Sequence, residues 1–253
     1  MINRQEKIKN ILEKELEINI SKLAKIFKVT EMTIRRDLKH LERRGTVILT
    51  KGLVKINRGN IFQLEYLERM KKNLKEKIAI ANKSLEFISN ENTIFICHGT
   101  TTYQLAKLLR NLDINLKVIT NALDTAMELA ASDKIDSYIH GGYVNKSYNV
   151  CDLDGSEVNK NDHLIDVMFT GGDGIDIEYG LTSFNQSDSL LYKRIIPNVR
   201  KVIALIDSSK FGIVRYEKLV TLDKISVLIT DSKISKETIK EYEKKNIIII
   251  VAT

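Results

Sequence analysis

The 253-residue sequence has one proline, no tryptophan and two cysteines, and its longest apolar run spans only residues 247–252. Two cysteines, Cys97 and Cys151, cannot form a disulfide framework, so nothing points to an oxidising compartment. An apolar run this short is far below the roughly 18 residues that a membrane span needs. The first residues, MINRQE, contain no apolar signal core. We therefore expect a cytoplasmic protein that makes no contact with a membrane.

Basic residues, by contrast, are abundant and concentrated at one end of the chain. Residues 1–60 carry 15 Lys and Arg against 7 Asp and Glu, a balance of +8, whereas the remaining residues carry 25 against 26, a balance of −1. A cationic first quarter joined to a near-neutral body suggests a polyanion-binding head on a domain with another task. Charge alone does not separate DNA from RNA or a membrane surface as the partner.

The first quarter of the chain has the pattern of three helices followed by a two-stranded wing. Apolar residues recur at helical spacing, small polar residues stand where helix caps are expected, and two short β-like runs flank a Lys-Gly turn. The expected elements are, in order, a helix over about residues 3–16, a helix capped by Ser21, a helix capped by Thr30 and ended by Gly45, and strands at 46–49 and 53–56.

The third of these helices carries a charged outward face. Ile34, Leu38 and Leu41 share one side and predict a buried stripe. Helix, short turn, helix and wing is the arrangement that places a helix N-terminus in the major groove of DNA, where arginine pairs with guanine or phosphate. The alternative is that the charges are merely solvated. The predicted contacts to double-stranded DNA are Ser21, Thr30, Thr33, Arg35, Arg36, Lys39 and Lys51.

Residues 4–49 resemble the winged-helix DNA-binding domain of the DeoR family of bacterial transcription regulators. The resemblance rests on the run SKLA at 21–24 and above all on VTEMTIRRDL at 29–38. It implies that the helix over about 31–44 reads an operator. The family usually follows its wing with a basic segment containing His-Gly-Gly, whereas this chain has TKGL at 50–53.

A connector without proline or glycine follows, from Phe62 to Ile88, and its apolar spacing predicts one or two helices. Arg69, Asn73 and Lys77 match a pattern that DeoR-type proteins show before the effector domain. We interpret these three residues as solvated parts of the connector.

The rest of the chain alternates short apolar runs with helical stretches, which predicts an α/β fold with a mainly parallel sheet covered on both faces. The expected helices lie at about 102–110, 122–131, 187–199 and 235–245. The expected strands are 93–97, 117–120, 137–140, 167–170, 201–206, 227–230 and 247–251.

Small and polar residues follow several of these strands, at the ends where parallel sheets bind ligands. Gly99, Thr100, Thr101 and Thr102 stand between a strand and a helix. Glycine permits close backbone approach, and a helix N-terminus favours negative charge, so this segment predicts a phosphate site. Further clusters at strand ends contain Asn121, Gly141, Gly142, Gly172, Asp173 and Lys210.

Together these clusters resemble the sensor domain of the DeoR family, which belongs with folds like those of ribose-5-phosphate isomerase and glucosamine-6-phosphate deaminase. The resemblance includes Gly155, Asp166 and the segments 180–182 and 230–231. It implies an effector site for a phosphorylated sugar or related metabolite, with phosphate on residues 99–102 and Lys210 nearby. Lys193 or Arg194 is a further candidate for the same site.

One position departs from that pattern. The family commonly has an aspartate two residues before the glycine of the threonine loop, and this chain has Cys97 there. A thiol is a poor acceptor for sugar hydroxyls, so either His98 compensates or the effector differs. Cys97, His98 and His140 lack the spacing of zinc sites, and we expect neither a metal nor a cofactor.

These observations predict a winged helix-turn-helix domain at 1–58, a linker helix at 59–74 and an effector sensor domain at 75–253. The expected function is sequence-specific repression of a carbohydrate operon, relieved by a phosphorylated sugar, by a homo-oligomer (dimer or tetramer).

Two alternatives compete with this prediction. An isomerase- or deaminase-like enzyme would need a general base, for which Asp173 and Asp207 are candidates. However, no pair of acids is marked out by spacing, and we expect no catalysis. A DNA-binding protein without an effector would leave the glycine-rich strand ends unexplained.

Overall fold

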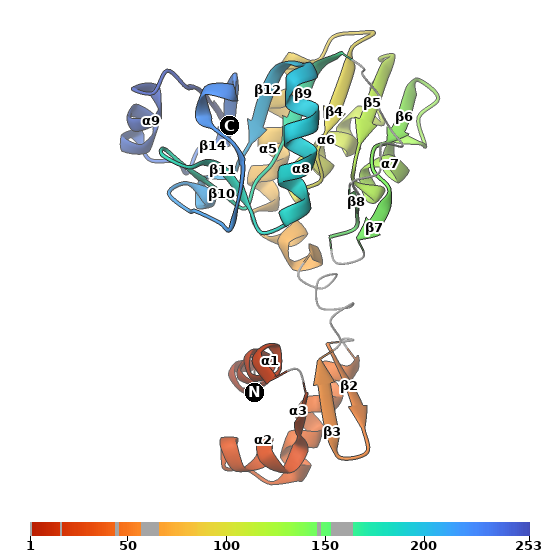
Figure 1. Cartoon of the computed structure of the whole chain (residues 1–253), viewed down its shortest axis with the longest axis vertical. Helices are drawn as coiled ribbons and strands as arrows, with labels where there is room; N and C mark the ends of the chain where they lie inside the picture. The colour runs from red at the N-terminus through yellow and green to blue at the C-terminus, as the bar shows by residue number, and fades with distance from the viewer. Residues whose placement is uncertain (1, 16, 44–45, 57–65, 146–147, 153–163) are drawn as a thin grey trace. The chain divides into compact units, whose positions relative to one another are not determined.

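The computed structural model describes residues 2–15, 17–43, 46–56, 66–145, 148–152 and 164–253. The chain forms two compact units (Figure 1). One comprises Met1–Glu68 with Lys146–Tyr148, and the other comprises Arg69–Asn145 with Asn149–Thr253. Each unit is described by itself below.

The first unit contains three helices and a small antiparallel sheet, as the sequence predicted. Its strands lie in the order β1-β3-β2, so that the wing hairpin is extended by β1, which the sequence did not reveal. The elements are α1 (Ile2–Glu15), β1 (Glu17–Asn19), α2 (Ile20–Phe27), α3 (Glu31–Arg43), β2 (Val47–Thr50) and β3 (Leu53–Ile56). Gly45 and Arg44, expected at the end of the third helix, lie outside the described residues.

The core of this unit is formed by the apolar stripes of its helices. Ile8, Ile34 and Leu38 are fully buried in one cluster. A partly buried ion pair joins two helices, because Arg4 Nε on α1 lies 2.5 Å from Asp37 Oδ2 on α3. This pair sits beside the apolar cluster and fixes α3 on the side opposite to its exposed charges.

The caps of the two central helices differ in part from the prediction. Thr30 caps α3, since its Oγ1 accepts a hydrogen bond from the Thr33 amide at 3.3 Å. Ser21 does not cap α2: the helix begins at Ile20, with Asn19 in the N-cap position. The prediction was wrong because the Ile20 amide bonds to the Gly52 carbonyl of the wing turn at 3.0 Å, a long-range contact that lets the helix start one residue before Ser21.

The second unit is built on a seven-stranded sheet in which every pairing is parallel. All seven strands expected from the sequence belong to it, in the order β15-β14-β12-β9-β4-β5-β6. Their bounds are β4 (Thr93–Ile96), β5 (Leu116–Thr120), β6 (Ile135–Ile139), β9 (Ile165–Thr170), β12 (Val199–Leu205), β14 (Val227–Asp231) and β15 (Ile248–Ala252).

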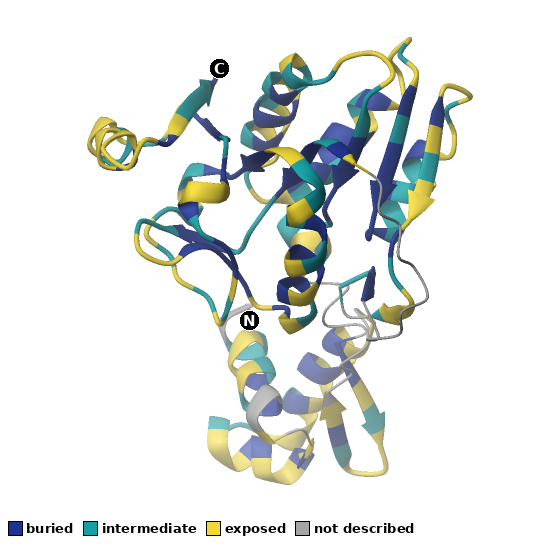
Figure 2. Ribbon diagram, turned by 45° about the horizontal axis from the view of Figure 1, so that its top comes forward, coloured by how far each residue is buried: buried dark blue, intermediate teal, exposed yellow. Residues whose placement is uncertain are grey.

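Helices cover both faces of this sheet, and the buried residues concentrate in its strands and on the helix sides that face it (Figure 2). The helices are α5 (Leu74–Ser84), α6 (Thr100–Leu109), α7 (Leu123–Leu129), α8 (Gln186–Ile195) and α9 (Lys236–Glu243). One apolar cluster joins one face of the sheet to α5, α6 and α7, and a second joins the opposite face to α8 and α9. The α/β class and the parallel sheet are thus confirmed.

Short strands that the sequence did not reveal flank the large sheet. They form a three-stranded antiparallel sheet and a hairpin. Their lengths of three or four residues are too small for a periodic pattern to emerge. They are β10 (Gly174–Asp176), β11 (Gly180–Ser183) and β13 (Glu217–Val220) in the sheet, and β7 (Tyr143–Asn145) and β8 (Val150–Asp152) in the hairpin.

The described part of the connector contains two helical segments, over residues 66–71 and in α5. Asn73 separates them with a left-handed backbone, φ 53°. Across the residues that the structure describes, every helix is too short or too polar to traverse a bilayer.

We predict that Leu38→Ala lowers the free energy of unfolding of the first unit by about 2–5 kcal/mol, because the side chain is fully buried and leaves a cavity. Urea unfolding followed by far-ultraviolet circular dichroism measures the loss. The matched control is His40→Ala on the exposed side of the same helix, for which we expect a change within about 0.5 kcal/mol. Equal effects of the two substitutions would contradict the assignment of the core.

Candidate functional site

The exposed face of α3 is the candidate DNA-binding surface. Arg35, Arg36 and Lys39 are exposed on it, and Arg35 lies 3.8 Å from Glu31 in an ion pair. Thr30 is exposed and Thr33 partly buried, and the two side chains contact each other at the start of the helix. Thr30, Thr33, Arg35 and Arg36 therefore lie at the N-terminal end of this helix. Lys39 lies in its second half, and all five are on or beside its outward face.

The two remaining predicted DNA contacts lie near one another on a different part of the first unit. Ser21 is exposed in the first turn of α2, and Lys51 is exposed in the turn between β2 and β3. The bond between the Ile20 amide and the Gly52 carbonyl brings these two neighbouring positions together.

In the second unit the strand order reverses between β4 and β9. From β4 the chain builds outward through β5 and β6, and from β9 it builds outward in the other direction through β12, β14 and β15. Loops that leave the carboxyl ends of β4 and β9 therefore diverge to opposite sides, and such a switch point is where open α/β sheets bind ligands. Gly99 lies in the loop after β4, with Thr100, Thr101 and Thr102 in the first turn of α6, and the predicted residues 172–173 lie in the loop after β9.

The loop after β4 has the geometry expected of an anion site. Gly99 has φ 155°, a value that L side chains rarely adopt, and α6 begins at the next residue. The first amides of α6 have no acceptor within the helix and point out of its N-terminus. The Thr102 hydroxyl donates to the Gly99 carbonyl at 3.0 Å, and the His98 amide donates to Asn121 Oδ1 at 2.9 Å. The last bond ties the loop after β4 to the end of β5.

The loop after β9 holds a carboxylate that is fixed from several sides. Asp173 Oδ1 lies 3.4 Å from Arg69 Nη1. Asp173 Oδ2 accepts from the Phe184 amide at 3.1 Å and from the Ser183 hydroxyl at 3.4 Å. Arg215 donates from Nε to the Asp173 carbonyl at 3.3 Å.

The loop after β12 is joined to the start of α5. Asp207 Oδ1 accepts from the Ser209 amide at 3.2 Å and from Asn73 Nδ2 at 3.0 Å. Lys210 follows in the same turn, with its amide bonded to the Asp207 carbonyl at 3.0 Å. Three loops of the sheet thus present polar groups at one edge, and two of them contact the segment before or at the start of α5.

Lys77 lies buried beneath this edge, 4% exposed. Its ammonium group donates to the Lys72 carbonyl at 2.7 Å and to the Arg69 carbonyl. Burial lowers the pKa of Lys77 to about 8; Asp207 opposes this, and the charges of Lys210 and Arg69 add to it. The interpretation of Lys77 as a solvated residue of the connector was therefore wrong. Helical spacing predicts that Lys77 is on a helix, but it does not reveal the distant loops that bury its side chain.

Two of the predicted glycines have a packing reason for their identity. A Cβ at Gly172 would lie 2.5 Å from Leu181 Cδ1, and one at Gly141, where φ is 136°, would lie 2.6 Å from Cys151 Cβ. Gly142 adjoins the second of these at the end of β6, and its amide bonds to the Asp152 carbonyl at 3.0 Å.

Lys193 stands apart from these loops, since it lies in the last turn of α8 with its side chain exposed. Gly155, part of the sequence resemblance, lies outside the described residues.

Comparison with known proteins accounts for both units. The DeoR-like helix-turn-helix domain matches residues 4–59, and the DeoR C-terminal sensor domain matches residues 72–232. The chain belongs to the DeoR family. The HTH-type transcriptional regulator GolR of Listeria innocua is 31% identical over 98% of this chain and 98% of that protein. The lactose phosphotransferase system repressor of Lactococcus lactis is 27% identical over 95% of each.

Among solved structures, D-ribose-5-phosphate isomerase in complex with phospho-erythronic acid is similar over 55% of this chain and 54% of that chain, at 21% identity and a TM-score of 0.40.

Cys97, at the position where DeoR proteins commonly have an aspartate, is part of the apolar core. Its side chain is 1% exposed in the cluster on the α8 side of the sheet, and burial raises the pKa of the thiol to about 12. Cys97 is therefore a neutral thiol in the core of the DeoR sensor domain.

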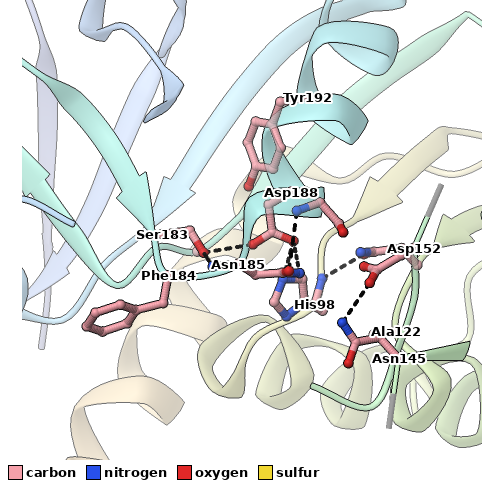
Figure 3. Close-up of polar contacts among 12 residues, drawn as sticks. His98, Ala122, Asn145, Asp152, Ser183, Phe184, Asn185, Asp188 and Tyr192 are labelled. Carbon is pink, nitrogen blue, oxygen red and sulfur yellow. Dashed lines mark hydrogen bonds and ion pairs between the residues drawn. The ribbon is translucent and has the colours of Figure 1, made fainter. Parts of the chain in front are cut away.

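The adjacent residue brings a carboxylate to the same strand end. His98 Nε2 lies 2.8 Å from Asp188 Oδ1, and Asp188 also accepts from Asn185 Nδ2 at 2.9 Å and from the Ser183 hydroxyl at 2.8 Å (Figure 3). Asp188 is 3% exposed. The sequence analysis did not identify Asp188, Asn185 and Ser183. A signal that could have led to them is the departure at Cys97, because it leaves His98 as the polar side chain after β4, and His98 contacts Asp188.

The pKa values of the two histidines near these strand ends, His98 and His140, are shifted in opposite directions. Burial lowers the pKa of His98, but the charge and hydrogen bond of Asp188 outweigh it, so the pKa is raised overall. Burial, with the charge of Arg194, lowers the pKa of His140. The strands before them, β4 and β6, are separated by β5. Within the described ranges, no three His, Cys, Asp or Glu side chains are grouped as metal ligands would be.

We predict that His98→Gln destabilises the sensor domain in a pH-dependent way. Because the pKa of His98 is raised in the folded state, its stabilisation is complete below the ordinary histidine pKa of about 6.5 and is lost as the pH rises through the folded value. A hydrogen bond to a charged group is worth about 1.5–3 kcal/mol. The gap in melting temperature between wild type and variant should therefore be wide near pH 5.5 and narrow near pH 8.5.

The comparison variant is His140→Gln. The pKa of His140 is lowered, so its effect on stability should follow pH in the opposite sense. A gap for His98→Gln that is constant with pH would contradict a charged pair with Asp188.

Proposed function

We propose that this DeoR-family protein represses genes of carbohydrate use and releases its operator when a phosphorylated sugar or related metabolite binds the second unit. The observation that carries the proposal is the presence, in one chain, of an exposed cationic helix and of a parallel sheet whose carboxyl ends carry the N-terminus of α6 after β4 and Lys210 after β12. Lys77 is buried near Asp207 and Lys210 at the same end. The names of relatives support a carbohydrate target, the lactose phosphotransferase system repressor among them.

The DNA-binding part comprises residues 1–58, joined by a linker at 59–74 to the sensor at 75–253. In it α3 enters the major groove, with Arg35 and Arg36 placed to contact guanine or phosphate, and the wing turn at Lys51 contacts the backbone. A homo-oligomer, dimer or tetramer, reads repeated or palindromic half-sites in the cytoplasm.

The effector phosphate lies at the N-terminus of α6, on the amides of Thr100, Thr101 and Thr102. Lys210 supplies positive charge from the loop after β12, and Lys77 adds to the field from beneath. Asp173 and Asn121 follow β9 and β5, the two strands that flank β4, and there they bond hydroxyl groups of the effector. The exposed position of Lys193 favours a lesser role for it.

The same edge offers a route by which the effector influences the DNA-binding part. Arg69, the first residue of the second unit, pairs with Asp173, and Asn73 bonds to Asp207. An effector that competes for these carboxylates, or adds charge beside them, weakens or strengthens the contacts of Arg69 and Asn73. The segment that contains these two residues leads to the DNA-binding part. Such a coupling is worth about 1–3 kcal/mol, or roughly 5- to 150-fold in operator affinity.

A binding role fits these acids better than catalysis does. Asp173 is engaged by Arg69 and the Phe184 amide, and Asp207 by Asn73 and the Ser209 amide. A general base needs its carboxylate free to take a proton from substrate, so we propose that the protein is not an enzyme. Turnover of pentose or hexosamine phosphates by the purified chain would reverse this conclusion.

We predict that Arg36→Ala weakens operator binding by about 1–3 kcal/mol and, if the contact is to phosphate, reduces the salt slope by about one. Fluorescence anisotropy at several salt concentrations measures both. The control is Lys240→Ala, which removes a cation from α9 of the sensor and should leave the affinity unchanged. Unchanged affinity of Arg36→Ala would count against α3 as the recognition helix.

We predict that Thr100→Glu abolishes the response to effector while leaving operator binding intact. A carboxylate at the first position of α6 repels a bound phosphate, yet stabilises the helix through its dipole. Thermal shift with a panel of sugar phosphates, and release of operator by any that binds, provide the measurement. Thr100→Gln is the uncharged control and should retain the response. A panel without any effect on the wild type would favour a DNA-binding protein that senses no phosphate.

A further inference from the structure

A large apolar side chain is exposed on the recognition helix. Met32, in the first turn of α3, is 76% exposed. Within α3, all of which the structure describes, the other large apolar side chains Ile34, Leu38 and Leu41 are buried on the opposite side. Met32 therefore contributes nothing to the core of the unit that carries it.

The surroundings of Met32 are cationic and their geometry is fixed. Residues three, four and seven positions onward share a helix face with it, and these are Arg35, Arg36 and Lys39, all exposed. The first turn is held by the cap of Thr30 on the Thr33 amide at 3.3 Å. A face of this charge disfavours contact with another copy of itself and favours a polyanion.

We infer that Met32 is a specificity-determining residue that contacts the 5-methyl group of a thymine in the operator. The N-terminal part of a recognition helix is the part that meets base edges. In the major groove thymine alone presents a methyl group, which is read by apolar contact. The flexible thioether of methionine adapts to such a surface, and the arginines beside it hold the helix on the phosphates and guanine edges.

The inference rests on DNA binding by α3. It adds a sequence preference that the cations of α3 do not provide by themselves. Cations bind DNA of any sequence through its phosphates. A methionine in the same face adds a preference for thymine over cytosine at one position of each half-site. Burial of one methyl-sized group is worth about fourfold in affinity, and that is the size of effect expected.

The experiment removes the methyl group and the methionine separately and together. The operator is selected from random duplex DNA with the full-length protein. Each thymine of the half-site is then replaced singly by deoxyuridine, which lacks only the 5-methyl group. For the wild type, we expect replacement at one position to weaken binding about fourfold. Met32→Ala should bind the unmodified operator about fourfold more weakly and should show no further loss with deoxyuridine at that position.

Two further variants make the result unambiguous. Met127→Ala removes a methionine that is 78% exposed on α7 of the second unit, and it should behave as wild type. Met32→Leu keeps an apolar side chain of similar size and should retain the deoxyuridine penalty; it decides the matter if Met32→Ala binds no DNA at all.

Three results would overturn the inference. They are a wild type that is indifferent to deoxyuridine at every position, a penalty of the same size in Met32→Ala, and a change in oligomeric state of Met32→Ala without a change in DNA preference. The first two leave DNA binding itself standing, whereas failure of the wild type to select any DNA sequence would overturn both proposals.

Discussion

The reversal of strand order between β4 and β9 is the constraint on which the sensor domain depends. A parallel sheet directs the carboxyl ends of all its strands to one edge, and the reversal makes the flanking loops diverge there. The polar segments after β4, β9 and β12 consequently meet at an edge whose underlying sheet is apolar on both faces. Each segment is unremarkable alone, and only their convergence makes a candidate site.

Buried charge at that edge is stabilised by partners rather than by water. Asp188 is held by His98, Asn185 and Ser183, and Lys77 by main-chain carbonyls. An unpartnered ion in such surroundings is costly. The same networks hold the loops in one arrangement, so their polar groups are already ordered.

The two units differ in how they use charge. In the DNA-binding unit one acid, Asp37, is buried against Arg4, and the cations of α3 remain exposed. In the sensor the cations Arg69 and Lys77 lie among carboxylates and carbonyls. The first arrangement suits a long polyanion that approaches from solvent, whereas the second compensates the cations of the sensor with nearby acceptors.

The sequence by itself determined the longer helices and the strands of the large sheet, because their signals are local. Apolar periodicity located the three helices of the first unit and the seven strands of the large sheet. Thr30 predicted the start of α3, because its side chain bonds to an amide only three residues away. Ser21 was wrongly taken as a cap because a distant carbonyl, that of Gly52, supports the helix one residue earlier. Tertiary structure alone decided the strand order, the burial of Lys77 and the pairing of His98 with Asp188. The partners in that pair are 90 residues apart, and a side chain's polarity does not reveal which distant group the sheet will bring beside it.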